Sequence, residues 1–376
     1  MDKNEYRKNA LDMIYLTSCA LKGEIPEKER TEALDLNALF SVCQKHILTA
    51  SVAYAIESAG IKDENFTQAK EKAIRKNILL DAERKKILDR LEKEHIWYMP
   101  LKGSILKDWY PKLGMRQMSD NDILCDGNFR RQIKDIMTDM GFSCEHYGRG
   151  NDDAYHKPPV CNFEMHNELF TVTHAGKLHE YYNDVKERLI KDEGNDFGYH
   201  FKDEDFYIYI TAHEYKHFVN GGTGVRSLAD TYVFLKKRSD TMDWDYIAAE
   251  TDKLGISEYE KNNSGLAMKL FSGEVLTEKE NELLDYHIFS GIYGNVTNST
   301  ENNLQSKAGG SKLKYIFYRL FPTMDMIQSW YPFFYRHKWL IPVLWIYRPF
   351  RGLVLNRSKL IAEFKTFIRL GRTSRS

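Results

Sequence analysis

A chain of 376 residues is longer than one compact core usually covers, so we expect two or three sub-domains. Its composition, 42% apolar and 29% charged with a net charge of zero, is that of an ordinary folded protein. No stretch of eighteen apolar residues occurs, and the opening MDKNEYRKNA has no apolar core of a signal peptide. The five cysteines form no CxxC pair, and their odd number favours a reducing compartment. We therefore expect a cytoplasmic protein without a membrane span.

The charge is distributed unevenly along the chain. Residues 311–376 contain 13 Lys and Arg against 2 Asp and Glu, which leaves 41 against 52 in the other 310 residues. Such asymmetry is typical of a segment that contacts nucleic acid, an anionic membrane surface or another polyanion. The alternative is that the basic tail docks on the acidic body of the same chain.

Residues 1–95 form an N-terminal helical region, because apolar residues recur there at helical spacing. Its longest helix runs from about 65 to 94 and is dense in Lys, Glu, Arg, Ala and Leu. The pattern changes in 96–175, where short strand-like segments alternate with helical ones. The expected strands are 96–101, 119–125, 142–147 and 160–166, and the helices between them are 104–110 and 129–140.

Residues 176–290 form a second helical domain, with its clearest helices at 205–219, 226–237, 244–254 and 258–271. Residues 291–311 are rich in Gly, Asn, Ser and Thr, so we expect a flexible connector. A basic, aromatic C-terminal arm, 312–376, follows. The predicted fold class is α+β, with a small mixed-sheet core flanked by N-terminal and C-terminal helical segments.

The core contains a turn suited to phosphate. An apolar segment ends in Lys102-Gly103-Ser104, and a short helix begins there. Small residues that open a helix can hold phosphate oxygens on free backbone N–H groups.

Carboxylates follow this turn on two strands. Asp120 and Asp122 lie two apart at an apolar strand, so they share one face. Glu164 and His166 alternate with Phe163 and Met165 on a later strand, whose polar face would line the same site. Carboxylates beside a phosphate-holding turn suit a hard cation and a nucleotide.

These residues resemble a known family. LKGSIL, WYPKLGMRQMSDNDIL and FEMH are similar, in this order, to the bacterial "uncharacterised nucleotidyltransferase" family of the polymerase-β-like superfamily. His213 and the segment from Arg226 to Asp230 continue the resemblance, as do tail motifs between 320 and 351. One departure is Lys102, since the wider superfamily usually has an apolar residue before its Gly-Gly or Gly-Ser.

The resemblance implies transfer of a nucleoside monophosphate from an NTP to a hydroxyl acceptor by a two-Mg²⁺ mechanism. Asp120 and Asp122 would hold both ions, and Glu164 would complete the ion facing the acceptor. The remaining predicted site residues bind phosphate or lie close to the nucleotide or acceptor. The phosphate ligands would be Lys102, Gly103, Ser104 and Arg116, and the further candidates are His166, His213, Arg226 and Asp230. The acceptor is a small molecule, a glycan precursor, a protein or RNA.

Two other functions stay open. The fold can persist as a catalytically inactive nucleotide-binding module. Residues 213–217, His-Glu-Tyr-Lys-His, also match the HExxH motif of zinc metallopeptidases. Lys216 counts against a peptidase, because such motifs usually have an uncharged residue there, and no second signature follows.

The C-terminal arm interleaves aromatic and basic residues. Such a segment can lie in a membrane interface, here the inner face of the cell membrane, or hold bases and phosphates of nucleic acid. Alternatively, its aromatic side chains pack on the body. The residues concerned are Trp330, Tyr331, Phe333, Phe334, Tyr335, Trp339, Trp345 and Tyr347, with Arg336, Lys338, Arg348 and Arg351.

Overall fold

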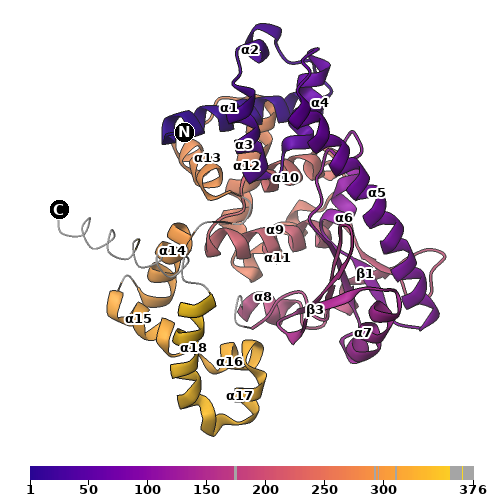
Figure 1. Ribbon diagram of the computed structural model, residues 1–376, viewed down its shortest axis with the longest axis vertical. Helices are drawn as coiled ribbons and strands as arrows, with labels where there is room; N and C mark the ends of the chain where they lie inside the picture. The colour runs from indigo at the N-terminus through magenta and orange to yellow at the C-terminus, as the bar shows by residue number, and fades with distance from the viewer. Residues whose placement is uncertain (173–175, 292–293, 295, 310, 356–365, 367–376) are drawn as a thin grey trace.

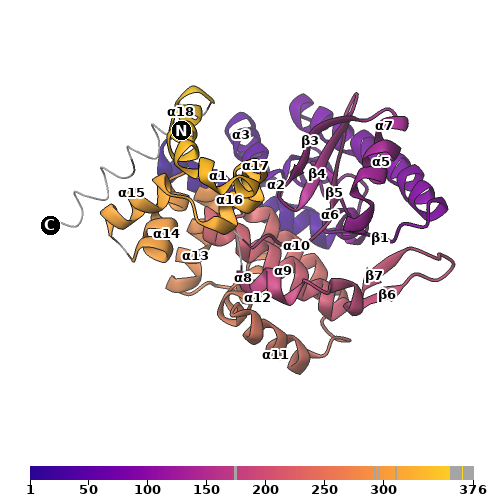
Figure 2. The same ribbon diagram turned by 90° about the horizontal axis from the view of Figure 1, so that it is seen from below.

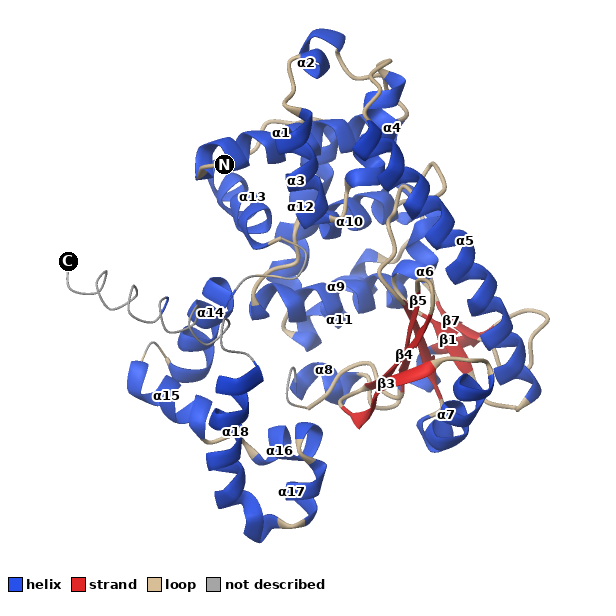
Figure 3. Ribbon diagram, in the orientation of Figure 1, coloured by secondary structure: helices blue, strands red, loops and turns tan. Residues whose placement is uncertain are grey.

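The computed structural model describes residues 1–376 apart from 173–175, 292–293, 295, 310, 356–365 and 367–376. Figure 1 shows the N-terminal helices at the top, a sheet at the lower right and a lobe of the last helices at the lower left. A mixed sheet surrounded by helices confirms the predicted α+β class (Figure 3).

The N-terminal region is helical, as predicted. Its helices are α1 (Lys3–Lys22), α2 (Lys28–Glu32), α3 (Leu36–His46), α4 (Thr49–Ser58) and α5 (Glu64–Lys93). Asp2, Asp35 and Asp63 each accept a hydrogen bond from a first-turn N–H, so α1, α3 and α5 begin with good N-caps. The long helix predicted from about 65 to 94 is α5.

These helices share a core with segments from the other end of the chain. Side chains of α1, α3 and α4 pack with those of α10 (Val225–Arg238), α12 (Ser257–Ser272) and α13 (Glu278–Ser290). Leu39, Leu228 and Phe271 are fully buried in this core. The domain boundaries predicted at 95 and 176 therefore separate segments that bury their apolar side chains together.

The central sheet has five strands in the order β1-β2-β5-β4-β3. The strands are β1 (Tyr98–Pro100), β2 (Asn121–Cys125), β3 (Ser143–Arg149), β4 (Asp152–Lys157) and β5 (Cys161–His166). Only the β2–β5 pair is parallel, and the other three pairs are antiparallel. The sheet is therefore mixed, as the sequence predicted.

The two faces of the sheet have different partners. Ile123 and Met165 lie on the face covered by α5 and α7 (Arg130–Asp139), where they pack with side chains such as Ile87 and Ile133. Asp122 and Leu124 alternate with them and lie on the opposite face. Leu124 there joins a cluster with residues of α9 (Asp203–Asn220).

Shorter elements complete this half of the molecule. Two of them link the turn after β1 to the strand β2: α6 (Gly103–Leu106) and η1 (Lys107–Trp109). The others are η2 (Gly127–Phe129), α8 (Gly176–Tyr181), η3 (Val185–Arg188), β6 (Leu189–Lys191), β7 (Tyr199–Phe201) and α11 (Trp244–Leu254). In Figure 2 the β6–β7 hairpin extends away from the body at the right.

The last lobe begins where a flexible connector was expected. Within 291–311, the structure instead has the helix α14 (Val296–Ala308). Its polar side chains explain why the sequence looked like a linker: Asn302 Nδ2 donates to Val219 O at 2.9 Å and to Tyr286 Oη at 3.0 Å. Side-chain amides thus fix this helix to α9 and α13.

Four helices and one 3-10 turn follow in the arm. They are α15 (Lys312–Leu320), α16 (Met324–Trp330), α17 (Pro332–Arg336), η4 (Lys338–Leu340) and α18 (Ile341–Leu355). In the part of the chain that the structure describes, no helix combines the length and apolarity needed to cross a bilayer. The predicted arm beyond 355 lies outside the described residues except for Thr366.

Candidate functional site

A cavity of ≈ 430 Å³ lies between the α9-facing side of the sheet and the helices α9 and α10. Most of the residues singled out in the sequence line it: Lys102, Gly103, Arg116, Asp120, Asp122, Glu164, His213, Arg226 and Asp230. Ser104 and His166 are not part of the lining. The structure therefore gathers predicted residues from five separate segments of the chain around one space.

Asp122 is at the centre of this arrangement. Its carboxylate is buried, and its Oδ1 accepts a hydrogen bond from Lys102 Nζ at 2.8 Å and from His166 Nε2 at 2.9 Å. Burial alone would raise the pKa of Asp122, but the Lys102 ammonium and His166 outweigh it and lower the pKa. Asp122 therefore stays ionised.

Glu164 lies directly beside Asp122. The parallel pairing of β2 and β5 sets the two residues opposite each other, so both side chains lie on the same face. Glu164 Oε2 is 3.5 Å from His166 Nε2. Asp122, Glu164 and His166 each offer a ligand atom, and these atoms all lie within 4.8 Å of one another.

His166 has its tautomer set by a neighbour. Asn151 Nδ2 lies 3.2 Å from His166 Nδ1 and also donates to the Glu168 and Leu169 carbonyls. Because the ionised Asp122 carboxylate can only accept, Nε2 carries a proton; burial would lower the pKa of His166, but the hydrogen bonds to Asp122 and then Glu164 raise it. That proton points to Asp122, so His166 acts here as a donor that holds the carboxylate.

Asp120 lies just before β2 and lines the same cavity, but it is not within the 4.8 Å group. Lys76 of α5 holds its position by donating to the Ser119 carbonyl at 2.7 Å. Burial, then Asp122 and then Glu164, raise the pKa of Asp120 to about 6. The three predicted carboxylates thus interact electrostatically, although only two of them are in close contact.

The Lys-Gly-Ser turn differs from the expected phosphate cradle. Ser104 is buried, and both its N–H and its hydroxyl donate to the Leu101 carbonyl, at 3.3 and 2.7 Å. Lys102 has a left-handed backbone with φ of 50°, which is unfavourable for a residue with a Cβ. The turn aims Lys102 at Asp122 and leaves Lys102 and Gly103, but not Ser104, on the cavity wall.

Gly103 is required by a neighbouring cation. A Cβ at this position would lie 2.2 Å from Arg116 Nη1. Arg116 is itself held by Asp230 through two bonds, Nε to Oδ1 at 2.7 Å and Nη2 to Oδ2 at 2.8 Å. Tyr110 Oη also donates to Asp230 Oδ1 at 2.7 Å. The charge of Arg116, a predicted phosphate ligand, is therefore already matched by a buried carboxylate.

Two other cations of the lining have no such partner. Arg226 has a buried Nε without a hydrogen-bond partner among the described residues, and its Nη1 contacts only the Gln117 carbonyl, at 3.5 Å. Burial and then Arg116 lower the pKa of Arg226. Lys216 forms no ion pair with a carboxylate among the described residues; its Nζ lies 5.7 Å from the centre of the Phe170 ring, and burial and then Lys102 lower the pKa of its amine to about 8.

Sequence reasoning missed Lys216 as a site residue and noticed it only as a charge inside HExxH. The available signal was its helical position, three residues after His213, which puts both on one face of α9. It also missed Asp152 on β4, whose Cα pairs with that of His166.

The HExxH residues do not form a zinc site here. His213 and His217 lie one turn apart, with their Nε2 atoms 3.3 Å from each other. Across the described part of the chain, no third His, Cys, Asp or Glu joins them as a ligand set. Glu214 instead points toward Thr231, with Oε2 and Oγ1 3.5 Å apart, and its pKa is raised by burial and then by Asp230. His213 remains a polar wall of the cavity, with a pKa lowered by burial and then by Lys102.

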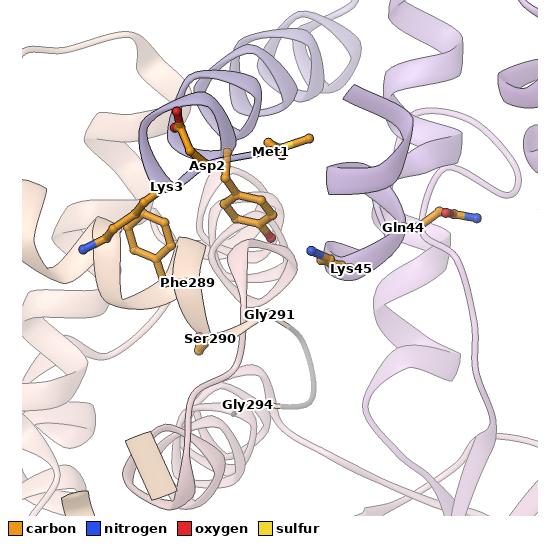
Figure 4. Close-up of a pocket in the computed structure, with 10 residues that line it drawn as sticks. Met1, Asp2, Lys3, Gln44, Lys45, Phe289, Ser290, Gly291 and Gly294 are labelled. Atoms are coloured by element: carbon orange, nitrogen blue, oxygen red, sulfur yellow. The ribbon is translucent and has the colours of Figure 1, made fainter. Parts of the chain in front are cut away.

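A second cavity, of ≈ 480 Å³, lies at the N-terminus and carries no comparable chemistry (Figure 4). Its two lysines already interact with aromatic rings. Lys3 Nζ is 4.7 Å from the centre of the Phe289 ring, and Lys45 Nζ is 4.7 Å from that of Tyr6. The smaller cavity, with its paired carboxylates and unmatched cations, is therefore the candidate site.

Comparisons with known proteins show the family of the chain. Residues 32–272 match the model of a family described as "Uncharacterised nucleotidyltransferase". A crystal structure of an antigenic nucleotidyltransferase-like protein from Paracoccidioides brasiliensis is similar at 11% identity, over 55% of this chain and 96% of that chain, with a TM-score of 0.34. A likeness that remote supports no inference, and no curated protein matches the chain. The family match covers well over half of the sequence and spans every residue that lines the candidate site, so the chain belongs to the uncharacterised nucleotidyltransferase family.

Proposed function

We propose that the protein transfers a nucleoside monophosphate from a nucleoside triphosphate to a hydroxyl acceptor, with Mg²⁺ held by carboxylates of the cavity. The observation that carries this proposal is the register of the sheet, which sets Asp122 beside Glu164 on the face that lines the cavity. Family membership supports the reaction class.

The carboxylates fit a hard cation. Mg²⁺ prefers oxygen ligands, and Asp120, Asp122 and Glu164 provide carboxylate oxygens on one wall. His166 would support them from behind, because its Nε2 proton is donated to Asp122. Bound Mg²⁺ would lower the pKa of the acceptor hydroxyl and neutralise charge on the phosphates.

The unmatched cations fit a polyphosphate. Lys216 and Arg226 line the same cavity as the carboxylates, and neither is paired with an acidic side chain among the described residues. Even a half-buried cation without a counterion has a cost, and phosphate oxygens would supply the missing charge. Lys102 would remain the partner of Asp122, and Arg116 would fix the shape of the wall.

The chemistry requires a hydroxyl on the acceptor, which small molecules, glycan precursors, proteins and RNA all carry. Activity should therefore be sought first without an assumed acceptor. Each of the four NTPs is incubated with the full chain and Mg²⁺, and pyrophosphate release and label transfer to the protein are measured together with binding.

The matched variants are Asp122→Asn and Asp245→Asn. Asp245 is an exposed carboxylate in the first turn of α11 and is not one of the residues that line the cavity. We expect Mg²⁺-dependent NTP binding in the wild type and in Asp245→Asn, and its loss in Asp122→Asn. Binding that is unaffected by Asp122→Asn would refute the proposed site. Binding without pyrophosphate release across a broad acceptor set would instead identify an inactive nucleotide-binding module.

A further inference from the structure

The helix α15 presents an apolar stripe to solvent. Its inward side chain is Tyr315, 5% exposed, which packs against Leu304 and Ala308 of α14. The residues at Leu313, Ile316, Phe317 and Leu320 follow the spacing i, i+3, i+4, i+7 of an apolar helix face. All four are exposed, Leu313 by 72% and Phe317 by 62%. This face is the one that a globular protein normally buries.

The helix α18 repeats the pattern. Leu344 is fully buried, whereas Val343, Ile346, Tyr347 and Phe350 have the same i, i+3, i+4, i+7 spacing and are exposed. Ile346 and Phe350 are each 65% exposed.

The two helices are in contact within one lobe (Figure 1). The ring of Phe321 lies 5.6 Å from that of Phe317 and 5.0 Å from that of Trp345. Arg348 Nη1 also donates to the Arg319 carbonyl at 3.0 Å. The two helices that carry the apolar stripes are therefore packed together in one folded lobe. Isolated apolar residues on a surface are normal, but stripes of this extent mark an interaction site.

Basic side chains accompany the apolar ones. Between 311 and 355 the sequence has seven Lys and Arg and one acidic residue, Asp325. Lys314, Arg336, Lys338 and Arg351 are exposed. Trp330 and Trp339 are also exposed, Trp339 by 77%.

We propose that the lobe α15–α18 docks on an anionic phospholipid surface, with the apolar stripes in the acyl boundary and the basic side chains at the headgroups. Amphipathic helices with aromatic and aliphatic residues on one side and Lys and Arg around them bind membranes in this way. Exposed tryptophans suit the headgroup level.

The aliphatic residues favour an anionic lipid surface over a nucleic acid. Single-stranded nucleic acid is bound by stacking bases on aromatic rings. Five of the eight stripe residues offer no ring for stacking: Leu313, Ile316, Leu320, Val343 and Ile346. A second copy of this chain would bring an equally basic lobe, so the seven cations would face seven others. An anionic lipid surface matches both the apolar and the charged parts.

The test uses the full-length chain and sedimented vesicles, either of phosphatidylcholine alone or of phosphatidylcholine and phosphatidylglycerol in equal parts. The double variant Phe317→Glu/Ile346→Glu removes one exposed apolar side chain from each stripe. Val275→Glu is the matched control, because Val275 is 93% exposed and lies outside the lobe. Thermal unfolding of all three proteins checks that the folded state is intact.

We expect the wild type and Val275→Glu to sediment with the anionic vesicles, less so at high salt, and to stay in solution with neutral ones. The double variant should bind about a hundredfold more weakly. Equal sedimentation of the double variant, or equal binding to neutral vesicles, would overturn the proposal. Failure of the wild type to bind lipid, together with a dimer in gel filtration that the double variant abolishes, would assign the surface to a second copy. A shift of single-stranded RNA by the wild type without lipid binding would assign it to nucleic acid.

Discussion

The contact between Arg116 and Asp230 predicts a large loss of stability when one partner is removed. Both side chains are buried, at 7% and 6% exposure, and two bonds of 2.7 and 2.8 Å join them. In Asp230→Ala the guanidinium stays buried without its counterion, which costs about 3–5 kcal/mol. The hydroxyl of Tyr110 also loses its acceptor, for about 1 kcal/mol or more. We expect the free energy of unfolding to fall by about 4–6 kcal/mol.

Replacement of all three side chains, Tyr110, Arg116 and Asp230, should recover most of the lost free energy of unfolding. The triple variant Tyr110→Phe/Arg116→Met/Asp230→Leu leaves no charge at these three positions, and apolar replacements of buried ion pairs are often neutral or stabilising. We expect its unfolding free energy to lie within about 2 kcal/mol of the wild type, as measured by urea unfolding followed by circular dichroism.

The same variant separates two roles of Arg116. If Arg116 shapes the wall beside Gly103, the folded triple variant should bind NTP and Mg²⁺ within about threefold of the wild type. If its guanidinium contacts phosphate, the loss of a charge-assisted bond should weaken binding about tenfold or more. A stable triple variant with tenfold weaker binding would therefore refute the structural role. An Asp230→Ala variant as stable as the wild type would refute the energetic argument.

Three further predictions concern other parts of the fold. Gly103→Ala should lower the unfolding free energy by about 1–3 kcal/mol in urea titrations, because the added Cβ would lie 2.2 Å from a guanidinium nitrogen of Arg116. The control is Gly265→Ala, a helical site where nothing lies within 4 Å of the added Cβ, and this variant should not destabilise the protein. His46 and His287 are buried, and their pKa values are lowered from 6.5 to about 4, by burial first in both cases. The unfolded state then binds protons first, so stability should fall as pH drops below about 6.5, by about 2 kcal/mol per histidine at pH 5, and His46→Gln should remove about half of that slope. A flat stability profile between pH 7 and pH 5 would contradict this. Lys216→Met should weaken NTP binding about tenfold at neutral pH, as measured by calorimetric titration. The difference in affinity from the wild type should shrink as pH rises through about 8, because the wild-type amine, whose pKa lies there, loses its charge. A difference in affinity that is independent of pH would exclude the amine as the phosphate contact.

The sequence predicted the long helices and the carboxylate strands well, because their apolar periodicity is strong. α5 and the helices α9 to α12 lie within a few residues of the predicted ranges. Asp122 and Glu164 were assigned to one face of their strands, and the structure places both there. What the sequence did not contain is the pairing itself, since β2 and β5 are separated by a helix and two strands.

The missed elements share a physical cause. The strand β4 has Asp153 at an inward position, 2% exposed, where an apolar residue would have revealed the alternation. Arg130 makes this burial tolerable through bonds of 2.7 Å to both oxygens of Asp153. The helix α14 is stabilised by side-chain amides, as at Asn302, which composition alone associates with linkers. Tertiary partners, invisible in one sequence, decided both cases.

The core that the N-terminal helices share with α10, α12 and α13 has a consequence for folding during synthesis. A ribosome releases α1, α3 and α4 long before α10, α12 and α13, yet Leu39 belongs to the same buried core as Leu228 and Phe271. Until those late helices emerge, the early ones expose their apolar faces, and such surfaces attract chaperones or aggregate. A gene fragment that stops after the sheet would encode Asp120, Asp122 and Glu164 and still yield a chain whose first helices lack the late helices that complete their core.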